Sequence, residues 1–147
     1  MRIQVVCVLL VSLCATVLSQ PADVYPRYQK FIDQHINRQM RIDRCDAVIN
    51  GKRISKTNSN ECKETNTFIR ANLNTVRSVC ERGGVPAGNG LTRSLNPFDI
   101  VVCTLKNHGG TVPHCRYRGQ SRTRYINFAC DRGYPVHFDG DIVHLEN

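Results

Sequence analysis

The stretch CKETNTF, residues 62–68, places a cysteine, a lysine and two threonines within seven positions. A bridged Cys62 would fix the backbone at the base of the long Lys63 side chain. Taken alone, Lys63 is more simply explained as a solvated lysine. Its meaning therefore depends on the other cysteines and on the side chains that the fold brings beside it.

The chain has eight cysteines, and two of them, Cys7 and Cys14, precede residue 20. An even, spread-out set in a small secreted domain predicts disulfides, here three, although spacing alone does not choose the pairing. A zinc site competes weakly, because no two cysteines are closely spaced and His108, His114 and Cys115 do not match zinc-finger spacing. We expect neither a metal nor a cofactor. The predicted disulfide cysteines are Cys45, Cys62, Cys80, Cys103, Cys115 and Cys130.

The first twenty residues, MRIQVVCVLLVSLCATVLSQ, have the layout of a secretory signal. Arg2 precedes an apolar run from Val5 to Val17, and Ser19 predicts cleavage after residue 19. Removal of nineteen residues from the 147 leaves a single domain of 128, residues 20–147. No later segment approaches the twenty apolar residues that a membrane-spanning helix needs. We therefore expect a secreted, extracellular protein without an integral membrane segment, and a monomer.

Basic residues outnumber acidic ones, with 20 Lys and Arg against 12 Asp and Glu. Loss of Arg2 with the signal lowers the net charge from +8 to +7. Such a surplus attracts polyanions: RNA and other nucleic acid, anionic cell-surface glycans or bacterial membranes. Charge does not rank these partners, and simple solubility is the alternative explanation.

Helical periodicity is confined to the first half of the chain. Residues 22–36 predict an amphipathic helix, with Asp23 as N-cap and Pro26 in its first turn. Further helices are predicted at 43–49 and 65–79. The apolar positions of the first helix follow the spacing i, i+3, i+4, i+7, i+8 and are Tyr28, Phe31, Ile32, His35 and Ile36.

Period-two alternation replaces the helical pattern from Leu91 onward. It occurs in NPFDIVVCTLK, residues 96–106, and in SRTRYINFAC, residues 121–130. Helices followed by strands predict an α+β domain in which helices pack on an antiparallel sheet. In PVHFD, His137 and Asp139 lie two residues apart, so a strand would place them on one face and let the carboxylate orient the imidazole. A surface pair on an edge strand is the alternative.

Two histidines and a lysine together carry more information than each does alone. His35 by itself is better explained as a satisfied core histidine on an apolar helix face. His35, His137 and Lys63 are nevertheless the minimal set for phosphodiester transesterification, with one imidazole taking a proton, one giving a proton and a cation facing the developing charge. RNA provides its own nucleophile, the 2′-hydroxyl, so this chemistry needs no metal-activated water.

Three segments carry a family resemblance. KFIDQH (30–35), CKETNTF (62–68) and VHFD (136–139) resemble, in order and spacing, the signature segments of the pancreatic-ribonuclease (RNase A) superfamily. NTFIRANLNTVRSVC (66–80) and CTLKNHGGTVPHCRYRG (103–119) are most similar to its angiogenin-like secreted members. The six cysteines also match that branch, since pancreatic ribonuclease has eight.

The resemblance implies a ribonuclease A-like α+β fold. Three helices would pack on a V-shaped antiparallel sheet in a kidney-shaped molecule, with the substrate groove between two lobes. The resemblance also implies the disulfide pairing, first with fourth, second with fifth and third with sixth: Cys45–Cys103, Cys62–Cys115 and Cys80–Cys130.

Catalytic roles follow from the resemblance residue by residue. His35 would be the general base that takes the 2′-hydroxyl proton, and His137 the general acid that protonates the departing 5′-oxygen. Lys63 would stabilise the pentacoordinate transition state. Gln34 would hydrogen-bond the phosphate, and Asp139 would orient His137. The reaction would leave a 2′,3′-cyclic phosphate.

Substrate contacts are implied in the same way. Thr67 would bond the edge of a pyrimidine through its hydroxyl and backbone, and its hydroxyl suits either cytosine or uracil because it both donates and accepts. Phe138 would pack against the base. Asn66 is a further substrate-binding position, and Lys30 would touch a neighbouring phosphate or only water.

The chain departs from the angiogenin-like pattern at two places. The segment 45–62 is longer than in angiogenin, and its Lys52, Arg53 and Lys56 lie where angiogenin has a basic nuclear-targeting cluster. These basic residues either direct uptake into the nucleus or nucleolus of target cells or form a solvated turn. The tail GDIVHLEN, residues 140–147, does not match the angiogenin terminus that obstructs the pyrimidine pocket.

The sequence is compatible with three classes of function. The first is a secreted, metal-independent endoribonuclease that cleaves 3′ of pyrimidines, with angiogenic or bactericidal activity. The second is a cationic signalling or antimicrobial protein whose activity does not depend on RNA cleavage. The third, an unrelated disulfide-knotted growth factor, leaves His35, Lys63, His137 and Thr67 unexplained.

Overall fold

The computed structural model describes residues 22–57 and 59–142, so the predicted signal at 1–19 lies outside the described residues. Within the described chain, no helix is long and apolar enough to cross a membrane. The helices are α2 (Tyr25–His35), η1 (Ile42–Arg44), α3 (Cys45–Gly51), α4 (Leu73–Arg77) and η2 (Ser78–Cys80). The strands are β1 (Thr65–Ile69), β2 (Gly84–Pro86), β3 (Leu91–Ser94), β4 (Phe98–Leu105), β5 (Tyr117–Asp131) and β6 (Tyr134–Ile142).

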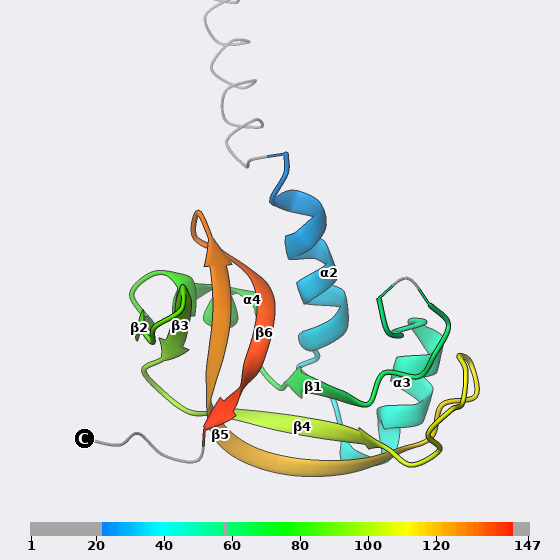
Figure 1. The fold of residues 1–147 in the computed structure, drawn as a ribbon. Helices are drawn as coiled ribbons and strands as arrows, with labels where there is room; N and C mark the ends of the chain where they lie inside the picture. The colour runs from blue at the N-terminus through cyan, green and yellow to red at the C-terminus, as the bar shows by residue number, and fades with distance from the viewer. Residues whose placement is uncertain (1–21, 58, 143–147) are drawn as a thin grey trace, which may run out of the picture.

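The strands form one antiparallel sheet around the long strand β5. Its order is β1-β4-β5-β3-β2, and β6 pairs with β5 off this path. The first half of β5 pairs with β4, and its second half pairs with β3 and β6. Because β5 bends between these halves, the sheet opens into two lobes (Figure 1). The predicted α+β fold, three helices on a V-shaped antiparallel sheet, is confirmed.

Each lobe has its own apolar core. In one lobe, α3 packs on β1, β4 and β5, with Ile49 and Phe68 fully buried among its side chains. In the other lobe, Phe31 of α2 meets Phe128 of β5 edge-on, with ring centroids 5.2 Å apart. The last turn of α2 is thereby fixed beside β1 and β6 (Figure 1).

Three disulfides join the helices and loops to the sheet, and their pairing agrees with the prediction. One connects α3 to β4 and one connects η2 to β5, while the third closes two loops near the start of β1. They are Cys45–Cys103, Cys80–Cys130 and Cys62–Cys115.

The helix predicted at 65–79 is wrong in its first half. Residues 65–69 form β1, which pairs with β4 in a register that sets Thr67 opposite Val102. β-Branched residues favour a strand at this place, where a neighbouring strand can pair with them. The helix begins only at Leu73, after Asn72 caps it by accepting a hydrogen bond from the Thr75 amide.

The start of α2 also differs from the prediction. The helix begins at Tyr25, and Val24 takes the N-cap position without a side-chain hydrogen bond, whereas Pro26 lies in the first turn as expected. Asp23 is not the cap, because its carboxylate pairs with Arg132 in the turn between β5 and β6. That ion pair ties the beginning of the helix to the sheet.

Candidate active site

His35 lies in the last turn of α2 and is buried. Its Nδ1 is 2.8 Å from the backbone carbonyl oxygen of Thr67. A carbonyl oxygen only accepts hydrogen bonds, so Nδ1 carries the proton and donates. The neutral ring is therefore left with Nε2 as a proton acceptor.

The environment of His35 disfavours its charged form. The pKa of His35 is lowered from 6.5 to about 4, mainly by burial. The hydrogen bond to Thr67 opposes this shift, and the nearby side chains of Lys63, His137 and Lys30 contribute to it. The ring is consequently neutral near neutral pH, which is the state that a general base requires.

A chain of two hydrogen bonds positions the Lys63 ammonium. Lys63 Nζ donates to Asn66 Oδ1 at 2.8 Å, and Asn66 Nδ2 donates to the backbone oxygen of Gln34 at 2.8 Å. Asn66 is buried and links β1 to the end of α2. Burial and, secondly, Lys30 lower the pKa of Lys63.

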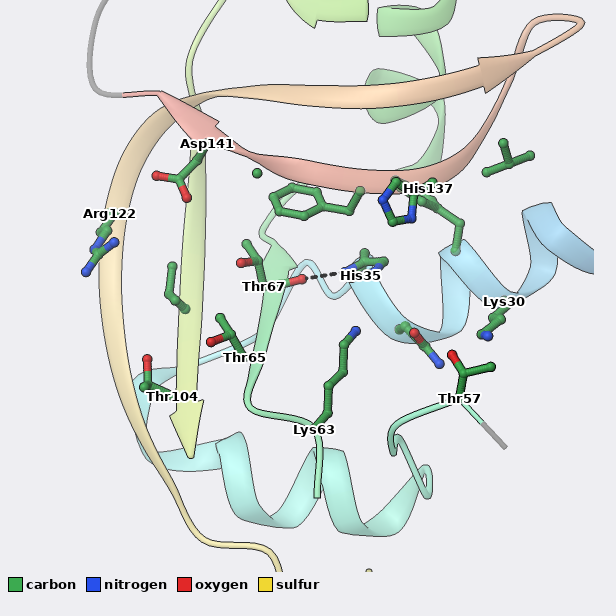
Figure 2. Close-up of a pocket in the computed structure, with 16 residues that line it drawn as sticks. Lys30, His35, Thr57, Lys63, Thr65, Thr67, Thr104, Arg122, His137 and Asp141 are labelled. Carbon is green, nitrogen blue, oxygen red and sulfur yellow. Dashed lines mark hydrogen bonds between the residues drawn. The ribbon is translucent and has the colours of Figure 1, made fainter. Parts of the chain in front are cut away.

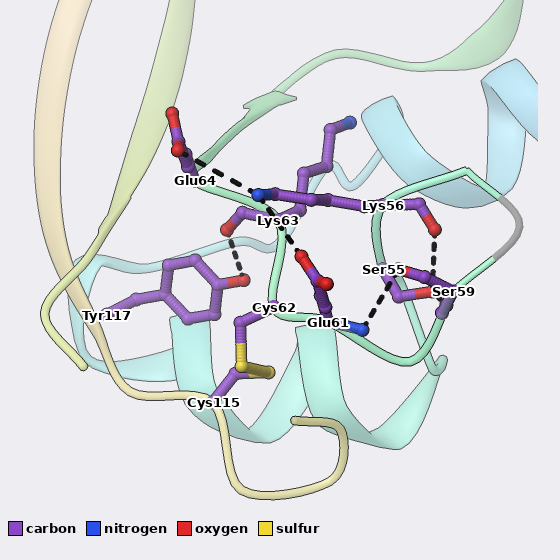
Figure 3. A network of polar contacts seen from close by, with 9 residues as sticks. All are labelled: Ser55, Lys56, Ser59, Glu61, Cys62, Lys63, Glu64, Cys115 and Tyr117. Atoms are coloured by element: carbon purple, nitrogen blue, oxygen red, sulfur yellow. Dashed lines mark hydrogen bonds and ion pairs between the residues drawn. A yellow bond between two sulfur atoms is a disulfide. The ribbon is translucent and has the colours of Figure 1, made fainter. Parts of the chain in front are cut away.

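The backbone of Lys63 is held from the opposite side (Figure 3). The Tyr117 hydroxyl donates to the Lys63 carbonyl at 2.7 Å, and the neighbouring Cys62 is bridged to Cys115. Burial, assisted by Asp46, raises the pKa of Tyr117 to about 12, so the hydroxyl keeps its proton and remains a donor. The base of the flexible lysine is thus fixed while its ammonium reaches into the site.

His137 lies on β6, in an environment unlike the buried one of His35. Its ring is exposed, and its Nε2 is 3.5 Å from Asp139 Oδ1. The two side chains share a face of the strand, as their two-residue spacing predicted. Because Asp139 faces Nε2, Nδ1 is the nitrogen available to a substrate.

One cavity of about 620 Å³ brings these groups together (Figure 2). The Phe138 ring stacks on the His35 ring at a centroid distance of 5.2 Å. Asn66 and Asp139 do not line the cavity but contact Lys63 and His137, which do. The predicted site residues that line it are Lys30, Gln34, His35, Lys63, Thr67, His137 and Phe138. Within the described ranges no group of three His, Cys, Asp or Glu side chains is arranged to hold a metal ion.

Comparison with known proteins agrees with this geometry. The family model described as pancreatic ribonuclease matches residues 26–139, which include every residue of the site named above. The chain belongs to the pancreatic ribonuclease family.

Individual relatives place this ribonuclease among angiogenin-like members. It is 39% identical to Ribonuclease-like 3 of Danio rerio, over 95% of this chain and 97% of the relative. It is 36% identical to Angiogenin-4 of Mus musculus, over 80% of each chain. The X-ray structure of zebrafish RNase5 aligns with a TM-score of 0.77 at 46% identity, covering 82% of this chain and 98% of that one. Membership supports ribonuclease activity with RNA as the substrate.

Several residues of the ribonuclease cavity were not predicted from the sequence. They lie on α2 and on strands β1, β4, β5 and β6, and one lies in the segment before β1. Thr65 has a visible signal, its two-residue spacing from Thr67 in TNT, whereas Arg122 reaches the cavity only through the register of β5 with β4. The full set is Phe31, Thr57, Thr65, Val102, Thr104, Arg122, Val136, Gly140 and Asp141.

Two of the three basic residues of the ribonuclease segment 52–56, Lys52 and Lys56, form surface ion pairs. Lys52 Nζ donates to the Asp33 carbonyl at 2.9 Å and lies 3.7 Å from the Asp33 carboxylate. Lys56 Nζ lies 3.4 Å from Glu61 and 3.9 Å from Glu64 (Figure 3). These ion pairs reduce the positive charge that a nuclear-targeting sequence would present.

Proposed function

We propose that the protein is a secreted endoribonuclease that cleaves RNA on the 3′ side of pyrimidines and leaves a 2′,3′-cyclic phosphate. The observation that carries this proposal is the placement of His35, His137 and Lys63 around one cavity (Figure 2). The two histidines differ in burial, so one ring is kept neutral while the other is open to solvent.

The proposed reaction is one transesterification. His35 Nε2 accepts the proton of the 2′-hydroxyl as that oxygen attacks phosphorus. The bond from phosphorus to the 5′-oxygen breaks, and His137 Nδ1 gives that oxygen a proton. Lys63 faces the negative charge that builds on the non-bridging oxygens, and Gln34 hydrogen-bonds the phosphate.

Recognition of the pyrimidine would depend on Thr67 and Phe138. Both line the cavity, and Thr67 is adjacent to His35 through its own carbonyl. The Thr67 hydroxyl can donate to or accept from the base edge, and Phe138 offers an aromatic surface for stacking. Lys30, which is exposed at the end of the cavity nearer His137, would contact a neighbouring phosphate (Figure 2).

Substitution of the two histidines tests the proposal. We expect His35→Ala and His137→Ala each to lower kcat/KM for a short pyrimidine-containing RNA by roughly a hundredfold to ten-thousandfold, because each removes a proton-transfer group. His108→Ala, at an exposed loop histidine, is the matched control and should cleave like the wild type. Unchanged cleavage by both active-site variants would contradict the proposed roles.

A second candidate function is angiogenic or bactericidal activity. The net charge, +8 for the full chain and +7 without the predicted signal, and the similarity to proteins named angiogenin favour it. We expect the His35→Ala/His137→Ala double variant to lose such activity if RNA cleavage causes it. Retention of endothelial stimulation or bacterial killing by that variant would assign the activity to cationic contacts instead.

A further inference from the structure

Asp141 is a charged side chain in the cavity that the proposed reaction does not use. It lies near the C-terminal end of β6, and Figure 2 shows it on the Arg122 side of the cavity, away from His137. We propose that Asp141 makes the enzyme prefer cytosine to uracil at the nucleotide that carries the attacking 2′-hydroxyl. This inference rests on the proposed function and names the base that the pocket selects.

A β-bulge turns Asp141 toward the base pocket. Regular alternation along β6 would place residue 141 on the same face as 137 and 139. Phe138 pairs with Phe128 and Asp141 pairs with Ile126, so three steps on β6 match two steps on β5. The extra residue moves Asp141 to the face of Phe138. Gly140 accommodates the irregularity with a φ of +112°.

Arg124 orients the carboxylate of Asp141, but only one of the two carboxylate oxygens lies near a partner in the described part of the chain. Its Oδ2 lies 3.5 Å from Arg124 Nε, and its side chain is 22% exposed. Among the described residues, Oδ1 has no hydrogen-bond partner. Arg122, the next cation along the same strand face, donates to Gln120 at 2.7 Å.

A carboxylate distinguishes the two pyrimidines by the group at position 4. Ionised Asp141 only accepts hydrogen bonds, whereas cytosine presents an amino donor there and uracil presents a carbonyl acceptor. The Thr67 hydroxyl suits either base. Val102, which pairs with Thr67 in the sheet, is apolar and offers that hydroxyl no side-chain partner. The preference should therefore come from Asp141.

Cleavage of matched substrates tests the assignment. Two DNA oligonucleotides, each with a single ribonucleotide, cytidine or uridine, would be cleaved by the wild type with kcat/KM favouring cytidine on the order of tenfold. Asp141→Asn should bring the ratio toward one, because its amide offers both a donor and an acceptor. Asp43→Asn is the matched control, since it breaks an exposed Arg41–Asp43 pair of similar length, 3.3 Å, on η1.

Binding separates this inference from the proposed function. Cytidine 3′-monophosphate should bind the wild type more tightly than uridine 3′-monophosphate, and Asp141→Asn should remove the difference while its melting curve shows a folded protein. Equal affinities in the wild type, or a ratio unchanged by Asp141→Asn, would overturn the role of Asp141. Cytidine selectivity in binding without any RNA cleavage would support this role and refute only the proposed reaction.

Discussion

His35 is buried at the end of α2, near the side chains of Lys63, Lys30 and His137. Removal of the imidazole from water is the largest cause of its lowered pKa, and the neighbouring cations add to it. Its neutral form is thereby favoured over a wider pH range than in water. The same environment ties both catalysis and stability to pH.

We expect the acid limb of the kcat/KM profile to fall near pH 4 instead of near 6.5, because His35 must lose its proton to act as a base. The unfolded chain binds this proton more readily, so stability is lost as the pH falls from 6.5 toward 4, by up to about 3 kcal/mol. NMR titration of the ring, assigned with His35→Gln, would measure the shift. A midpoint near 6.5 in the folded protein would contradict it.

Individual site residues could be predicted only in combination. The apolar neighbours of His35 favour a core histidine, and Lys63 alone is an ordinary surface lysine. Their combination with His137 identified the chemistry. The Lys63–Asn66 hydrogen bond spans only three residues, but the bond from Asn66 to the Gln34 carbonyl joins β1 to α2. That second bond and the place of Asp141 depend on tertiary packing, so no local sequence pattern could have given them.

At the scale of elements, residues 65–79 show why the helix prediction failed. Phe68, Ile69, Leu73, Val76 and Val79 have helical spacing, but β1 gains backbone pairing with β4 across five residues. The strand buries Phe68 in one lobe and Ile69 in the other, which a helix at this position would not do. Tertiary pairing overrode the local pattern.

Gly119 allows β5 to approach η1 closely. A Cβ there would lie 2.2 Å from the Ile42 carbonyl oxygen, which is backbone and must shift. We therefore expect Gly119→Ala to lower the free energy of unfolding by about 1–3 kcal/mol in urea denaturation.

Gly51 provides the matched control for that measurement. A Cβ at Gly51, the last residue of α3, meets nothing within 4 Å. Gly51→Ala should leave stability unchanged or raise it by roughly 0.4–1 kcal/mol. Equal effects of the two substitutions would show that close approach at η1 is not the reason for glycine at 119.

At the scale of the molecule, two of the three disulfides can be compared: one stabilises the fold alone, and the other also holds the backbone beside Lys63. Cys80–Cys130 joins η2 to β5 away from Lys63, whereas Cys62–Cys115 adjoins it. Both close loops of about fifty residues, with sequence separations of 50 and 53. Loss of either disulfide should therefore lower stability by a similar amount, but the two losses should differ in their effect on activity.

We expect Cys80→Ala/Cys130→Ala and Cys62→Ala/Cys115→Ala each to lower the free energy of unfolding by about 2–5 kcal/mol. Only the second pair should also lower turnover, measured at a temperature where both variants are folded, because it releases the backbone beneath Lys63. Equal turnover in the two variants would argue against this anchoring role.

The overall architecture was largely predictable, because three signature segments and six cysteines resemble those of the pancreatic-ribonuclease family, and that resemblance implies the fold and the disulfide pairing. The α+β class and the disulfide pairing agree with the structure. The V shape of the sheet followed from the resemblance, but the place of its bend, in β5 between two sets of partners, follows from no local pattern. It depends on which strands pair with each half of β5, and these lie far apart in the chain.

Thr67 links two functions that a site could have kept apart. Its carbonyl orients His35, while its side chain lines the proposed base pocket. A base that displaces Thr67 would also turn the His35 ring, so a poorly fitting nucleotide would be bound and left uncut. Discrimination against a base that displaces Thr67 should then appear in kcat more than in KM, unlike the choice between cytosine and uracil by Asp141, which is one of affinity. Natural selection could not alter Thr67 without also changing the rate of bond cleavage.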